Sequence, residues 1–130
     1  MLALGTLQPV NTDATIDISA TEEERFILSF GLGEWGGPAS CTAELATAMG
    51  FEDVADLHAT GQRIATDVTA NTPLTQLDWV RALFATEVVF ASDVVGSGLD
   101  WAVTSGISDA DTIRLLRSIQ RKLAASIDAR

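Results

Sequence analysis

Residues 74–95 read LTQLDWVRALFATEVVFASDVV and decide the fold. Apolar side chains in this stretch recur at helical spacing, and they extend nearly all the way round the predicted helix. A helix that is apolar on every side is normally enclosed by other helices. The stretch therefore predicts a central helix over residues 74–95, with the remaining helices packed around it.

The segment that follows the central helix predicts a short helical turn and then a long helix. Gly96-Ser97-Gly98 ends the central helix, and residues 99–104 have the length of a single helical turn. Ser108 is a good N-cap, and the apolar residues after it form one stripe at helical spacing. A last helix is therefore expected from Ser108 to the C-terminal end.

The segment that precedes the central helix predicts three more helices. Thr72 and Pro73 provide a cap and a first-position proline for the central helix itself. Gly50 stands where a left-handed helix cap belongs. The expected helices cover residues 52–70, residues 40–49, and a first helix that begins at the capping box of Thr21 and that the glycines from Gly31 onward end.

The N-terminal residues differ from the rest of the chain. Residues 1–18 lack helical periodicity, and Thr15-Ile16-Asp17-Ile18 alternates as an extended arm would. No linker and no internal repeat divides the remainder. We therefore expect an all-α fold, a compact bundle of about five or six helices around the central helix at about 74–95. The irregular N-terminal arm is expected at 1–18 and a single helical domain at 19–130.

The composition restricts the possible partners. A mean hydropathy of +0.23 is high for a chain of 130 residues, which indicates either helices buried on more than one face or an apolar patch covered by another subunit. The net charge of -10 opposes binding to nucleic acid or to an anionic membrane surface. The start has no cationic region of a signal peptide, and charged residues interrupt the apolar runs before they reach the length of a membrane span. With one cysteine, which cannot form an intrachain disulfide, we expect a cytoplasmic protein.

Glu87 is the least expected residue, because it lies in the apolar run of the central helix. A buried carboxylate needs a partner, since burying it alone costs several kcal/mol or raises its pKa. One interpretation is a structural ion pair with Arg63, Arg81 or Arg114. The other is a ligand-binding carboxylate in an internal pocket that Glu87 and Asp93 line, with Asp100 and Arg81 as further candidate ligand-binding residues.

Two other features indicate contact with a partner or within the fold. The loop around Trp35 combines a tryptophan with many glycines, so it is either a docking loop anchored by Trp35 or a tight corner with Trp35 packed inward. Arg114, Arg117 and Arg121 lie along one face of the last helix. This arginine row is expected to pair with carboxylates of the same chain or of a second subunit, with residues 22–24 as candidates.

No pattern in the chain amounts to a catalytic, cofactor or metal signature. The segment 44–64 has the spacing of a helix-turn-helix, but its second helix carries acidic residues that would repel phosphates. His58 is the only histidine, and Cys41 has no histidine nearby in the sequence. We therefore expect no cofactor and an interaction or regulatory module, not an enzyme, that acts as a homo-oligomer, such as a homodimer, or as a complex subunit. The alternative is a small-ligand-binding protein or enzyme whose internal pocket is lined by Glu87 and Asp93.

Overall fold

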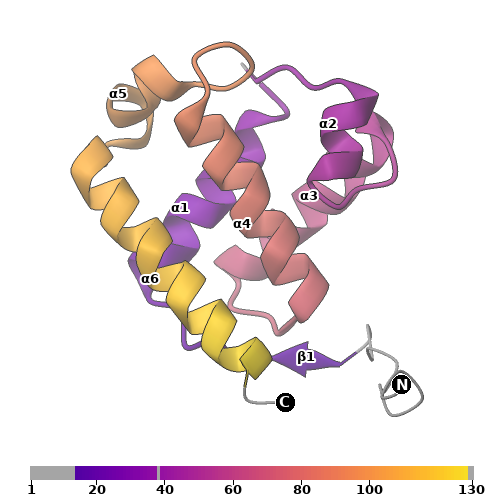
Figure 1. The fold of residues 1–130 in the computed structure, drawn as a ribbon, viewed down its shortest axis with the longest axis vertical. Helices are drawn as coiled ribbons and strands as arrows, with labels where there is room; N and C mark the ends of the chain where they lie inside the picture. Colours follow the sequence, from indigo (N-terminus) through magenta and orange to yellow (C-terminus); the bar gives the residue numbers. More distant parts are fainter. Residues whose placement is uncertain (1–13, 38, 129–130) are drawn as a thin grey trace, which may run out of the picture.

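The computed structural model describes residues 14–37 and 39–128, and it confirms an all-α bundle (Figure 1). Residues 1–13 of the arm predicted at 1–18 lie outside the described residues, as do Pro38 and residues 129–130. In chain order the elements are β1 (Thr15–Ile16), α1 (Glu22–Glu34), α2 (Ala43–Ala48), α3 (Val54–Thr69), β2 (Leu74–Thr75), α4 (Gln76–Ala91), the 3-10 turn η2 (Gly98–Asp100), α5 (Trp101–Ser105) and α6 (Asp109–Asp128).

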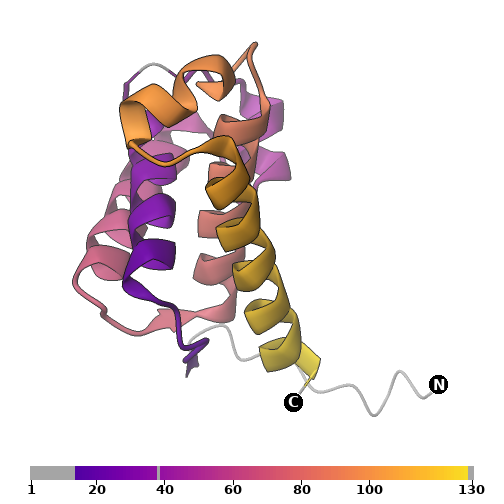
Figure 2. The same cartoon turned by 90° about the vertical axis from the view of Figure 1, so that its left-hand side faces the viewer.

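The helices form two layers. Figure 2 shows α1 and α3 in one layer and α4 and α6 in the other, so that α1 and α4 lie across the middle of the molecule. The core between the layers contains Ile27, Leu57, Ile64, Val89 and Ile119, all of them almost completely buried. None of the described helices covers the side of α4 that faces away from α1 (Figure 1).

Helix α1 begins as predicted and ends later than predicted. Thr21 and Glu24 form the full capping box. The glycines at 31 and 33 do not end the helix, which continues to Glu34. The reason is packing: a Cβ at Gly31 would lie 2.4 Å from Thr86 Oγ1 and 2.8 Å from Thr86 Cα. Gly31 therefore lets α1 and α4 approach more closely than any other residue would allow.

The central helix α4 is shorter than the predicted range of 74–95. Leu74 and Thr75 form β2, which pairs antiparallel with β1, and Thr75 caps α4 by accepting a hydrogen bond from Asp78 N. The side chain of Trp79 donates from Nε1 to Ile16 O at 3.2 Å and holds β1 in place. The predicted cap at Thr72 was wrong because Leu74 and Thr75 are used for strand pairing before the helix starts.

The C-terminal end of α4 is set by close packing of the chain that follows. The backbone becomes extended at Ser92, whose Oγ accepts hydrogen bonds from Val94 N and Val95 N. A Cβ at Gly96 would lie 2.4 Å from Val89 O, so the chain turns back tightly over the last turn of α4. Gly96 therefore allows the turn that the sequence assigned to Gly96-Ser97-Gly98.

The remaining helix boundaries agree with the sequence to within a few residues. Gly50 has a φ of +100°, and Phe51 N donates to Ala46 O at 3.0 Å, so the predicted left-handed cap of α2 is confirmed. Asp53 caps α3 through Asp56 N, and Ser108 caps α6 through Asp111 N.

Candidate functional site

The outer side of α4 carries large apolar side chains that the fold leaves in solvent. Leu77 is 39% and Phe84 is 43% exposed. Leu77, Phe84 and Ala91 are seven residues apart, so they lie on one side of the helix with a drift of only about 20° per step. The opposite side of α4, with Ala82 and Thr86, is completely buried against α1. Helix α4 is therefore central but not enclosed, which differs from the expectation of a helix surrounded on every side.

A groove between α4 and α6 adjoins this exposed side. Its volume is about 230 Å³, and it opens to solvent. Ile113 on α6 is 50% exposed and lines the groove together with Ala91, which also belongs to the exposed side of α4. The full lining consists of Glu87, Phe90 and Ala91 from α4 and Ile113, Leu116, Arg117 and Gln120 from α6. We call this groove, together with Leu77 and Phe84, the α4–α6 face.

The polar residues of the groove form a short chain of hydrogen bonds. Gln120 Nε2 donates to Glu87 Oε2 at 2.5 Å, and Arg117 Nη1 donates to Gln120 Oε1 at 3.2 Å. Glu87 is only partly buried, so the carboxylate keeps contact with water. The amide of Gln120 thus links an acidic and a basic side chain on the rim of one apolar groove.

The arginines expected to pair with Glu87 have other partners. Arg63 and Arg81 both bind the buried carboxylate of Asp78, at 3.0 and 3.2 Å, and Arg114 pairs with Asp111 at 3.0 Å. The structural interpretation of Glu87 as an arginine ion pair was therefore wrong. Its partner is a neutral amide, because the α6 residue opposite Glu87 is Gln120.

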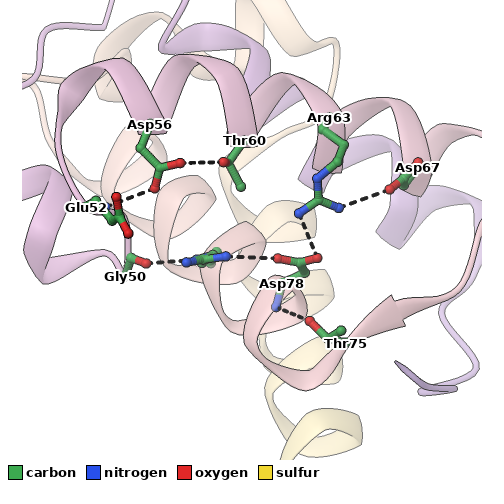
Figure 3. A network of polar contacts seen from close by, with 9 residues as sticks. Gly50, Glu52, Asp56, Thr60, Arg63, Asp67, Thr75 and Asp78 are labelled. Atoms are coloured by element: carbon green, nitrogen blue, oxygen red, sulfur yellow. Dashed lines mark hydrogen bonds and ion pairs between the residues drawn. The ribbon is translucent and has the colours of Figure 1, made fainter. Parts of the chain in front are cut away.

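The Asp78 network joins α3 and the turn before it to α4 (Figure 3). Arg63 binds both Asp78 and Asp67, while Arg81 Nε donates to Gly50 O at 2.8 Å. The guanidinium of Arg81 also lies over the ring of Phe51, 5.4 Å from its centroid. Both arginines therefore have partners within the fold, and Arg81 connects α4 to the turn between α2 and α3.

Close to this network, Asp56 lies in the first turn of α3. It accepts hydrogen bonds from Thr60 Oγ1 and Glu52 N (Figure 3). The hydrogen bonds from Thr60 and Glu52 lower the pKa of Asp56, with a smaller opposing effect of burial. Asp56 is therefore an N-terminal helix carboxylate with local partners, which agrees with an ordinary helical corner in this segment.

The four residues proposed to bind a ligand lie in different surroundings. Glu87 lines the α4–α6 groove, whereas Arg81 contacts Gly50 and Asp78 on the other flank of α4. Asp93 and Asp100 are exposed, after the end of α4 and in η2. Of the four, only Glu87 lines the groove.

Trp35 packs inward, as the structural interpretation of its loop proposed. It is 3% exposed, and its Nε1 donates to Ala85 O at 3.2 Å. Beside it, Gly33 and His58 line a groove of about 390 Å³ between α1 and α3. A buried tryptophan bonded to the backbone of α4 fixes the end of α1 and is not available as a docking anchor.

The arginine row meets α1 through a neighbouring lysine. Lys122 Nζ lies 2.6 Å from Glu24 Oε1, and Glu24 is 1% exposed. Burial alone would raise the pKa of Glu24, but hydrogen bonds from Lys122 and Thr21 outweigh it and lower the pKa. Arg114 and Arg121 line a cavity together with Glu24, whereas Arg117 lines the α4–α6 groove. Arg114 pairs with Asp111 of the same chain, but among the described residues the ion pair with the start of α1 belongs to Lys122, so the expected pairing of the row with residues 22–24 is not found.

Sequence reasoning missed two residues that the structure makes prominent. Gln120 carries no charge and therefore gave no signal as a partner of Glu87. Glu34, in the glycine-rich stretch, is 7% exposed, and its Oε2 has no hydrogen-bond partner in the described part of the chain. Burial raises the pKa of Glu34. A glutamate just before Trp35 and the glycines gave no sequence signal of burial.

Other chemistry finds little support among the described residues. Cys41 is partly buried, and burial raises the pKa of its thiol. Within residues 14–37 and 39–128, no three His, Cys, Asp or Glu side chains gather as a metal site. None of the helices described is long and apolar enough to cross a membrane. Comparison of the chain with family models, with curated proteins and with solved structures gave no match.

Proposed function

We propose that this chain is a protein–protein interaction module and that its contact surface is the α4–α6 face. The observation that carries the proposal is the pair of large, partly exposed side chains, Phe84 on α4 and Ile113 on α6, beside an open apolar groove. Aromatic side chains surrounded by apolar contacts and a polar rim are typical of interface centres. Here Glu87 and Arg117 form the rim.

Two other apolar surfaces are weaker candidates. Phe26 on α1 is 45% exposed and lines a groove of about 340 Å³, but Glu22 and Glu23 line the same groove. Val94 and Val103 are still more exposed, yet neither lines the α4–α6 groove. Leu99 is exposed as well, and these three side chains come from the loop after α4, from η2 and from α5. Exposed aliphatic side chains that line no groove are normal on a protein surface.

The alternative of an internal ligand pocket has less to support it. It needs Glu87 and Asp93 to line one enclosed space. Glu87 lines an open groove of about 230 Å³, which is smaller than the roughly 300 Å³ at which small-molecule pockets usually begin. Asp93 is exposed and does not belong to the lining.

The test compares two phenylalanines of nearly equal exposure on different helices. Phe84→Glu alters the α4–α6 face, and Phe26→Glu is the matched control on α1. The chain is expressed at natural level in its own host with a cleavable tag. After mild cross-linking and removal of the tag, the mass of its assembly is measured by native mass spectrometry. We expect the unaltered chain and Phe26→Glu to occur in assemblies larger than 13.7 kDa and Phe84→Glu to occur as the monomer.

Two outcomes would contradict the proposal. One is an unaltered chain that occurs only as a 13.7 kDa monomer in the host. The other is an assembly that Phe26→Glu breaks and Phe84→Glu leaves intact, which would assign the contact to α1. Circular dichroism of both purified variants establishes that each is folded.

A further inference from the structure

We infer that the partner of the α4–α6 face is a second copy of this chain, related by a two-fold axis that passes between Glu87 and Arg117. The inference rests on the proposed function of that face and adds the identity of the partner. It follows from three features of the face: its balance of charge, its symmetry and its exposed apolar side chains.

The balance of charge favours this face over the groove beside Phe26, which is the other groove among the described residues with a large exposed aromatic side chain. Two copies with a net charge of -10 repel each other wherever acidic surfaces meet. The groove between α4 and α6 is lined by one carboxylate, Glu87, and one guanidinium, Arg117, so its charged residues sum to zero. The groove beside Phe26 is lined by Glu22 and Glu23 and only one basic residue. A second copy therefore meets less repulsion at the α4–α6 face than at the groove beside Phe26.

In a two-fold dimer, the two opposite charges of this face can pair with those of the second copy. In a two-fold interface, if one residue of the first copy contacts a second residue of the partner, then the second residue of the first copy contacts the first residue of the partner. Glu87 and Arg117 come from neighbouring helices and bind the two ends of the same amide, that of Gln120. An axis between them sets Glu87 opposite Arg117 of the partner subunit and Arg117 opposite the partner's Glu87. A face with charges of one sign could not match itself in this way.

The apolar side chains lie close to the proposed axis. Phe84 precedes Glu87 by three residues on α4, and Ile113 precedes Arg117 by four on α6. Each pair is about one helical turn apart, roughly 5 Å along the axis. Helices α4 and α6 run antiparallel (Figure 1), so Phe84 and Ile113 lie on opposite sides of the charged residues along the groove. The two-fold therefore places the two copies of Phe84 on one side of the charged contacts and the two copies of Ile113 on the other. Both sets of apolar side chains are then covered by the partner subunit, which stabilises the contact.

The test uses charge reversal in the purified full chain. Glu87→Arg leaves only basic side chains at positions 87 and 117, and Arg117→Glu leaves only acidic ones. Each variant alone would place like charges opposite each other at both contacts of the homodimer. An equimolar mixture of the two variants restores opposite charges at both contacts of the heterodimer. Within either variant, positions 87 and 117 carry charges of the same sign. Recovery of the affinity in the mixture can therefore come only from contacts between the two chains.

Sedimentation equilibrium measures the outcome at about 0.1 M salt, where long-range repulsion is screened. We expect the unaltered chain to dimerise with a dissociation constant below about 100 µM. Each single variant is expected to dimerise at least about tenfold more weakly, and the mixture is expected to recover the affinity. Phe84→Glu is expected to be monomeric.

The outcomes separate the inference from the proposed function. A purified chain that is monomeric at about 100 µM, while Phe84 is needed for an assembly in the host, overturns the second copy as partner and leaves the interaction function in place. A dimer that Phe84→Glu does not weaken overturns both. A dimer that needs Phe84 but in which the mixed charge variants fail to associate overturns the axis between Glu87 and Arg117.

Discussion

The close approach of α1 and α4 at Gly31 makes a sharp prediction, because Gly33 on the same helix is a natural control. A methyl group at position 31 would lie 2.7 Å from Thr86 Cβ and 2.8 Å from Thr86 Cα, whereas a methyl group at position 33 would meet nothing within 4 Å. Alanine is preferred over glycine inside a helix by about 1 kcal/mol. Gly33→Ala is therefore expected to stabilise the protein by about 0.5–1 kcal/mol.

At Gly31 the same gain is opposed by overpacking. Overpacking typically costs about 1–3 kcal/mol, and the upper end is expected here because the contact includes a backbone atom. Gly31→Ala should therefore destabilise the protein by about 2 kcal/mol, with a fall in Tm of about 8 °C. Replacing Thr86 by alanine in addition would not restore stability, since Cα and Cβ remain.

Urea unfolding followed by circular dichroism measures both variants. The comparison is informative because helix propensity changes equally at the two positions, so the difference in the free energy of unfolding isolates the contact with Thr86. If Gly31→Ala is as stable as Gly33→Ala, then α1 and α4 do not pack at this distance. The position of the α4–α6 face, which depends on that packing, would then be wrong.

Three further variants test individual contacts through the free energy of unfolding. Because burial raises the pKa of Glu34, its protonated form stabilises the fold fully below the ordinary value of 4.5, and this contribution is lost as pH rises through the raised pKa. Glu34→Gln should thus be more stable than the unaltered chain by about 1 kcal/mol at neutral pH, and a difference that persists at low pH would contradict the explanation. Asp78→Asn should destabilise by about 3 kcal/mol because Arg63 and Arg81 lose their shared carboxylate, and a loss near zero would mean that the network is not formed in solution. Thr21→Ala should destabilise by about 1 kcal/mol by removing the cap of α1, and thermal unfolding without a change in Tm would refute the cap.

The parts of the fold that could be predicted are those that local sequence determines. Thr21 and Ser108 cap helices through backbone groups three residues away, and Gly50 adopts its positive φ because of the turn in which it lies. Such signals are complete within a few residues. The start of α4 could not be read in this way, because Thr75 belongs to a strand pair with Thr15, which is 60 residues earlier.

The candidate site depended on information that a single sequence does not contain. The structural role of Gly31 depends on its contact with Thr86, which lies on another helix. In a single sequence, a glycine that permits close packing of two helices cannot be distinguished from a glycine that ends a helix. Glu87 was recognised as exceptional from its apolar neighbours alone. Its partner was sought among arginines because charge is visible in a sequence, whereas the position of the neutral Gln120 opposite it depends on how α4 and α6 are aligned.

The apolar character of α4 on every side has two physical origins. The side with Ala82 and Thr86 carries small side chains because it packs closely against α1. The side with Leu77 and Phe84 is large and apolar although the described residues leave it partly exposed. Periodicity cannot distinguish a helix enclosed by its own fold from one half covered by its fold and half by a partner. A mean hydropathy of +0.23 is therefore what a chain with an interface on α4 would have.

Magnitudes decide which forces would govern such a contact. Two charges of -10 with centres about 30 Å apart, roughly twice the expected radius of gyration, repel by about 14 kcal/mol in water without salt. With a Debye length of about 10 Å at 0.1 M salt, the repulsion falls to the order of 1 kcal/mol. Exposed pairs such as Glu87 with a partner's Arg117 contribute about 0–1 kcal/mol each. Completing the burial of two copies of Phe84 and two of Ile113 contributes about 1 kcal/mol for each side chain, since about half of each is already buried. The apolar side chains thus set the affinity at physiological salt, while the charged pairs select the face and the orientation in which two acidic chains can meet.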